Sequence, residues 1–136
     1  MKIKLFESFV NEGGIKRQAW ALSGEMRSKI DSEINNVLIE LVDNGFEIEI
    51  DHFSKKIAEQ NSILVSVHKI NNNERFNTDE VKDNLEVLLA YMDENYGVKS
   101  HDYNVEIIAA WPNNRAVSEE YPDNLEVIEI DVDITI

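Results

Sequence analysis

The feature that most constrains the fold of this chain is a segment that occurs twice. Residues 37–43 (VLIELVD) return as residues 87–93 (VLLAYMD), and a glycine, Gly45 or Gly97, follows each copy closely. Two runs with strand-like alternation come after each glycine. A repeat of this length is typical of one supersecondary unit used twice. We therefore expect two helix–strand–strand (αββ) repeats, over residues 23–70 and 77–136.

Each unit opens with an apolar stripe at helical spacing. In the first unit the stripe consists of Met26, Ile30, Ile34, Val37, Leu38, Leu41 and Val42. In the second unit it consists of Val81, Leu85, Leu88, Leu89 and Met92. Ser23 is the expected N-cap of the first helix, and Asn44-Gly45 is its expected left-handed stop. Asn77 and Glu80 have the spacing of a capping box for the second helix.

Alternating apolar and polar residues predict four strands. The first two lie at residues 46–51 and 63–68, and the apolar positions of the last two are Tyr103, Val105, Ile107, Ala109 and Trp111, then Ile128, Ile130, Val132, Ile134 and Ile136. Such alternation indicates a sheet that is covered on one face only. We therefore predict an α+β two-layer sandwich in which an antiparallel four-stranded sheet carries two helices on one face. Residues 15–136 would form this single domain.

The composition restricts the partners. The chain carries 27 acidic against 13 basic residues, a net charge of -14, and no cysteine. Nucleic-acid binding is disfavoured because it depends on Lys and Arg that neutralise phosphates. No apolar run approaches the ~20 residues that span a bilayer, so we expect no membrane partner. The acidic excess suits a basic protein partner, a divalent cation or simple solubility.

The acidic residues are concentrated on the polar faces of two predicted strands. These faces contain Glu47, Glu49 and Asp51 in the first strand, and Glu129, Asp131 and Asp133 in the fourth. Along each strand the carboxylates would be roughly 6.6 Å apart. Such rows could hold a divalent cation, meet a basic surface or imitate nucleic-acid phosphates. Alternatively, they form a solvated face whose charge prevents edge-to-edge pairing.

The histidines give little indication of catalysis. A loop over residues 54–61 places His52 opposite Ile63 and His68 opposite Glu47, so the two imidazoles would be roughly 17 Å apart. His101 is expected in a loop without a third ligand nearby. The sequence also lacks a nucleophile elbow, a glycine-rich phosphate loop and a His-Glu-x-x-His pair. We therefore expect no enzyme, no metal and no cofactor, although the carboxylate rows leave a metal-dependent enzyme as a third class.

Two segments have features of protein-binding elements. The predicted hairpin connection over residues 111–122 is longer than usual and contains Trp111, Arg115 and Tyr121, residue types that are enriched in binding hot spots. It could instead fold back on its own aromatic residues. Residues 1–14 predict an amphipathic segment, ended by Gly13-Gly14, that docks on another protein or on the chain's own core. Its apolar stripe consists of Ile3, Phe6, Phe9 and Val10.

The N-terminal residues also show a family resemblance. Met1-Lys2 and the following Phe6-Glu7-Ser8-Phe9-Val10-Asn11-Glu12 resemble the leader of many proteins of T-even-type tailed phages. In internal head proteins of that group the leader targets the protein to the assembling capsid, and Val10-Asn11-Glu12 is similar to the prohead protease cleavage pattern. The resemblance implies a small virion or accessory protein, located in the virion or the host cytoplasm.

The leading hypothesis is therefore a non-enzymatic, phage-encoded protein that binds another protein, as a virion component or as cargo of the head. The alternative is an acidic inhibitor that mimics nucleic acid toward a host defence or DNA-binding protein. The open edges of the predicted sheet would also allow homo-oligomers to form by strand pairing.

Overall fold

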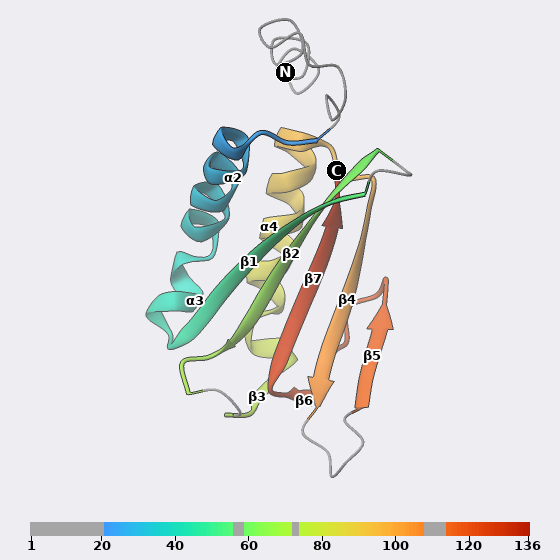
Figure 1. Cartoon of the computed structure of the whole chain (residues 1–136). Coiled ribbons are helices and arrows are strands. Elements are labelled where there is room, and N and C mark those ends of the chain that lie inside the picture. The colour runs from blue at the N-terminus through green and yellow to red at the C-terminus, as the bar shows by residue number, and fades with distance from the viewer. Residues whose placement is uncertain (1–20, 56–58, 72–73, 108–113) are drawn as a thin grey trace, which may run out of the picture.

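The chain forms an α+β structure built on an antiparallel sheet (Figure 1). The computed structural model describes residues 21–55, 59–71, 74–107 and 114–136. The helices are α2 (Gly24–Val37), α3 (Ile39–Asp43), the 3-10 helix η1 (Thr78–Glu80) and α4 (Lys82–Tyr96). The strands are β1 (Phe46–Lys55), β2 (Gln60–Lys69), β3 (Phe76–Asn77), β4 (Ser100–Ile107), β5 (Asn114–Ser118), β6 (Glu126–Val127) and β7 (Glu129–Thr135).

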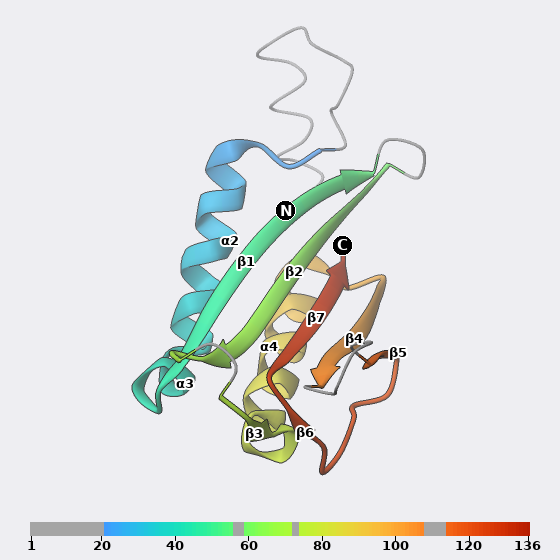
Figure 2. The same ribbon diagram turned by 60° about the horizontal axis from the view of Figure 1, so that its bottom comes forward.

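Five strands form the main sheet, in the order β1-β2-β7-β4-β5, and every neighbouring pair is antiparallel. The short strands β3 and β6 form a separate ladder. Figures 1 and 2 show α2 and α4 on the same side of the main sheet. The other face of the sheet carries no helix from the described part of the chain.

The prediction of four strands was wrong, because the sheet has a fifth. Residues 114–118, which we expected inside a long connection, form β5 and pair with β4 from Tyr103–Ser118 to Ile107–Asn114. The sequence gives little signal for this strand, since a short edge strand buries few side chains. It forms by pairing with the backbone groups that β4 would otherwise leave exposed at the sheet edge.

Local sequence signals set the helix boundaries. The Ser23 hydroxyl accepts a hydrogen bond from the Met26 N–H at 3.1 Å, which confirms Ser23 as an N-cap. The capping box of Asn77 and Glu80 is also confirmed, but it opens η1, which leads into α4. Gly45 adopts a φ of +90°, a conformation that residues with a Cβ rarely adopt.

The apolar stripe predicts one continuous first helix, but the structure has two helices here. The helical stretch is interrupted at Leu38, whose φ of -98° and ψ of 14° separate α2 from α3. No proline or glycine marks this point. Leu38 is fully buried, and the break allows α3 to pack against β1. Tertiary packing therefore decided this feature.

The core lies between the helices and the inner face of the sheet. It contains Ile30, Ile34, Leu41, Leu85, Leu88 and Met92 from the helices, Leu38 from the break between α2 and α3, and Ile63, Val65, Val67, Tyr103, Val105, Ile130, Val132 and Ile134 from the strands. Within the described ranges, no helix is both long and apolar enough to cross a membrane.

An open acidic sheet face as the candidate functional site

The strand registers place acidic residues in rows across the open face. Residues directly opposite each other in antiparallel strands point to the same face. The first row reads Glu47, His68, Glu129 and Glu106 across β1, β2, β7 and β4. The second row reads Glu49, Ser66, Asp131 and Asn104, and the third reads Asp51, Leu64, Asp133 and Asp102. We call these three rows the acidic face.

All six acidic residues predicted for this face lie on it. The carboxylates of β1 and those of β7 do not lie on neighbouring strands, however, because β2 separates β1 from β7. At the usual strand spacing of about 4.8 Å, the carboxylates of β1 are about 10 Å from those of β7. Strand order could not be inferred from the sequence. The sequence analysis therefore did not predict that Glu106 and Asp102 lie beside β7, or that His68 lies between β1 and β7.

Two pairs of carboxylates face each other directly across the β4–β7 ladder. Glu106 is in register with Glu129, and Asp102 is in register with Asp133. Like charges at directly opposed positions of a ladder destabilise the sheet. Because carboxylates from β1, β7 and β4 gather on it, the acidic face is the candidate functional site.

His68 lies in the first row of the acidic face, between Glu47 of β1 and Glu129 of β7. Its Nδ1 is 2.8 Å from the Lys69 carbonyl oxygen, so Nδ1 donates a hydrogen bond. Its Nε2 is 3.9 Å from Glu47 and 3.7 Å from Glu49, whose side chains are 51% and 64% exposed. The backbone contact fixes the ring, and the two carboxylates of β1 remain accessible to a partner.

Glu129 is the most perturbed carboxyl group of the acidic face. Burial, a hydrogen bond with Asp131, and the charges of Asp131 and Glu106 raise the pKa of Glu129 to about 7, whereas His68 opposes the shift. A neutral Glu129 donates this hydrogen bond to Asp131. Near neutral pH this part of the face therefore holds a proton that an incoming positive charge would displace.

The remaining histidines do not contribute to the acidic face. The predicted register of His52 and His68 is confirmed, and the odd offset along β1 places the two rings on opposite faces of the sheet. His52 contacts Asp31 of α2 at 2.6 Å on the inner face. His101 was expected in a loop but lies in β4, with its ring 5.4 Å from that of Tyr103. In the portion of the chain that the structure describes, no three His, Asp or Glu side chains are placed to hold a metal ion.

The residues predicted to bind a partner are spread over the chain. The segment 1–14, with Ile3, Phe6, Phe9 and Val10, lies outside the described residues, as does Trp111. Arg115 belongs to β5, where its backbone is in register with Glu106. Tyr121 is half-buried: its hydroxyl donates a hydrogen bond to the Thr78 carbonyl at 2.6 Å, and its ring lies 5.0 Å from that of Tyr103. The partner-binding role of these residues stays a prediction.

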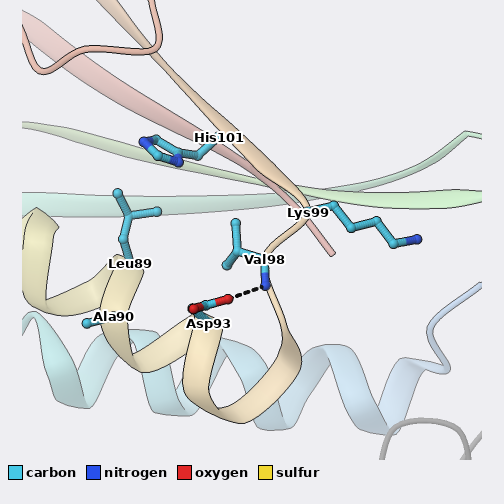
Figure 3. Close-up of a pocket in the computed structure, with 6 residues that line it drawn as sticks. All are labelled: Leu89, Ala90, Asp93, Val98, Lys99 and His101. Carbon is cyan, nitrogen blue, oxygen red and sulfur yellow. Dashed lines mark hydrogen bonds between the residues drawn. The ribbon is translucent and has the colours of Figure 1, made fainter.

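A hollow of about 350 Å³ lies between the end of α4 and the start of β4 (Figure 3). Its lining residues are Leu89, Ala90, Asp93, Val98, Lys99 and His101. The Asp93 carboxylate already accepts a hydrogen bond from the Val98 N–H at 3.0 Å. Figure 3 shows the Lys99 side chain extending away from the hollow. Few polar groups converge here, so the hollow is a weaker candidate than the acidic face.

No protein-family model, curated protein or solved structure matches this chain. The acidic face is therefore interpreted from its own geometry and charge.

Proposed function

We propose that this protein is a non-enzymatic binding protein whose acidic face holds a basic surface of another protein. The observation that carries the proposal is the gathering of carboxylates from β1, β7 and β4 on one sheet face that bears no described helix. A positively charged partner surface would be electrostatically complementary to this face. The arrangement favours the inhibitor that mimics nucleic acid among the hypotheses raised by the sequence.

The spacing of the carboxylates supports the same proposal. Along β1, Glu47, Glu49 and Asp51 succeed one another at roughly 6.6 Å, and a second line runs parallel along β7. A protein that binds nucleic acid presents Lys and Arg to two lines of phosphates. The acidic face offers two lines of carboxylates on a rigid sheet. A DNA-binding protein of the host is therefore the partner class that we propose.

The test compares the protein with a variant in which β1 loses its charges, Glu47→Gln, Glu49→Gln and Asp51→Asn. Binding of a nona-arginine peptide, chosen as a basic probe, is measured by isothermal titration calorimetry at several salt concentrations. We expect wild-type affinity to fall steeply with salt, because exposed charges are screened. The variant should bind about tenfold more weakly, which corresponds to about 1.4 kcal/mol.

The matched control is Glu40→Gln, Asp43→Asn and Glu94→Gln, which removes the same charge from exposed positions of α3 and α4. It should retain nearly full affinity. Equal losses in both variants would show that only net charge matters, and the proposed role of the acidic face would then be rejected.

The virion role is a proposal of a different kind, which rests on residues 1–12 and their resemblance to a phage leader. It places the protein in the virion or the host cytoplasm, with Ile3, Phe6 and Phe9 as docking residues. Deleting residues 1–12 and measuring incorporation into particles tests it. Unchanged incorporation would exclude the docking role of this segment.

We also propose that the sheet derives from two αββ units. In the order β1-β2-β7-β4, the second strand of each unit is central and the first strand lies outside it. Both units contribute a helix to the same side of the sheet (Figures 1 and 2). On this view β5 and β6 are additions to the second unit.

A further inference from the structure

The main sheet ends at two edge strands, β1 and β5, which differ in charge. An edge strand exposes unpaired backbone N–H and C=O groups, and charged side chains commonly prevent another strand from pairing there. Two copies joined along β1 would bring the like charges of Glu47, Glu49 and Asp51 together. Residues 114–118, which form β5, include no acidic residue. β5 is therefore the edge at which a second chain can add a strand.

Val117 adds an apolar contact to this edge. Its side chain is 68% exposed, the largest fraction among the large apolar residues of the part of the chain that the structure describes. Val117 is in register with Asn104 of β4, so it lies on the same side of the sheet as the acidic face. A strand that pairs with β5 would cover Val117, and the removal of its apolar surface from water would stabilise the contact.

The order of residues along β5 is self-complementary in one antiparallel register. Two copies of a strand that pair in this way are related by a two-fold axis, and the residue on the axis meets its own copy. With Val117 on the axis, valine faces valine, and position 115 of each copy faces position 119 of the other. These positions hold Arg115 and Glu119. Opposite charges are then directly opposed at two places, which stabilises the ladder.

The neighbouring two-fold registers lack this match. An axis at Ala116 would place Arg115 opposite Val117, and an axis at Ser118 would place Val117 opposite Glu119. Neither register forms an ion pair or a pair of apolar side chains. Glu119 follows β5 directly and is exposed, so a second copy can reach it. The sequence of the strand therefore selects a second copy of this chain, in a single register.

We propose that two copies of this chain pair antiparallel through β5, with Val117 on the two-fold axis. The axis is perpendicular to the sheet, because opposed residues of a ladder share a face, so both acidic faces lie on the same side of one continuous sheet. At about 4.8 Å per strand, the β4 strands of the two copies are about 14 Å apart, beyond the Debye length of about 8 Å at physiological salt. Their acidic rows are therefore largely screened from each other.

The test measures self-association of the full-length protein by sedimentation equilibrium at physiological salt. One short strand pair buries little surface, so we expect a weak dimer with a Kd between about 10 μM and about 1 mM. Val117→Lys places like charges on the axis and should weaken the dimer at least about tenfold. The matched control is Val87→Lys, the same change at a side chain of α4 that is 58% exposed. It should change the Kd by less than about twofold, because single exposed charges contribute little.

Charge reversal tests the register. Arg115→Glu and Glu119→Arg, each alone, should weaken the dimer at least about fivefold, because like charges then face each other at two places. The double variant with both changes should return to within about twofold of the wild-type Kd, because opposite charges face each other again. The two single changes shift the net charge in opposite directions, so a general effect of net charge cannot weaken both.

Three outcomes would overturn the proposal: a monomer at every concentration up to about 1 mM, equal weakening in Val117→Lys and Val87→Lys, or a double variant as weak as the single variants. The proposed function of the acidic face does not depend on these results. That proposal fails only if the β1 variant binds nona-arginine as well as its control does. The two proposals can therefore be rejected separately.

Discussion

At the scale of single residues, Glu129 lies in a setting that favours its protonated form. It is surrounded by Asp131 on its own strand, by Glu106 on β4 and by His68 on β2. A partly buried carboxyl group in this setting is stable when protonated, and its charged form is kept only at a cost in stability. This arrangement makes the stability of the protein depend on pH near neutrality.

The pKa of Glu129 is raised from 4.5 to about 7 in the folded chain. Between these values the folded state binds more protons than the unfolded state, so stability falls as pH rises through 7. Solvent screening limits this contribution to about 1 kcal/mol. Urea unfolding at about pH 5 and about pH 8 should show this loss in the wild type but not in Glu129→Gln. Glu126→Gln, at an exposed nearby position, should behave like the wild type.

At the scale of elements, Thr78 fixes the segment between β5 and β6. It is fully buried, and its hydroxyl donates to the Pro122 carbonyl at 2.5 Å and accepts from the Leu125 N–H at 3.1 Å. The Tyr121 hydroxyl donates to the Thr78 carbonyl. These contacts hold the return from edge strand β5 to central strand β7 against η1.

Replacing Thr78 with valine keeps the size of the side chain but leaves the Leu125 N–H and the Pro122 carbonyl unsatisfied. We expect the free energy of unfolding to fall by about 2 kcal/mol. Tyr121→Phe removes only one hydrogen bond of this set and should cost about 1 kcal/mol. Urea denaturation measures both. A Thr78→Val protein as stable as the wild type would show that these contacts do not stabilise the return segment.

At the scale of the whole molecule, the fold separates the packed core from the acidic face. The core lies between the helices and the inner face of the sheet, whereas the acidic face lies on the opposite side. Charges on that face can therefore change without loss of the packing that holds the sheet together. The rows on β1 and β7 add to the excess of acidic residues that gives the chain its net charge of -14.

The variant Glu47→Gln, Glu49→Gln and Asp51→Asn should consequently retain its stability. It loses the two acidic neighbours of His68, at 3.7 and 3.9 Å, but it also loses repulsion among the carboxylates. Each effect at an exposed site is below about 1 kcal/mol, and the two oppose each other. Thermal unfolding should give a free energy within about 1 kcal/mol of the wild type. A larger loss would mean that these side chains have a structural role.

The sequence by itself determined the features that depend on local physics. The caps at Ser23 and Asn77, the turn at Gly45, the register of His52 and His68 and the polar face of β1 all follow from short-range geometry. Capping needs neighbouring residues only, and alternation along a strand fixes which side chains share a face.

Only the tertiary structure decided the strand order, the break at Leu38, the edge strand β5 and the position of β4 beside β7. Each of these depends on which distant segments meet, and short-range patterns carry no record of that. In the sequence, Asp102 and Glu106 look like ordinary polar residues of a strand. They join the acidic face only because β4 and β7 are neighbours, which puts them in register with Asp133 and Glu129.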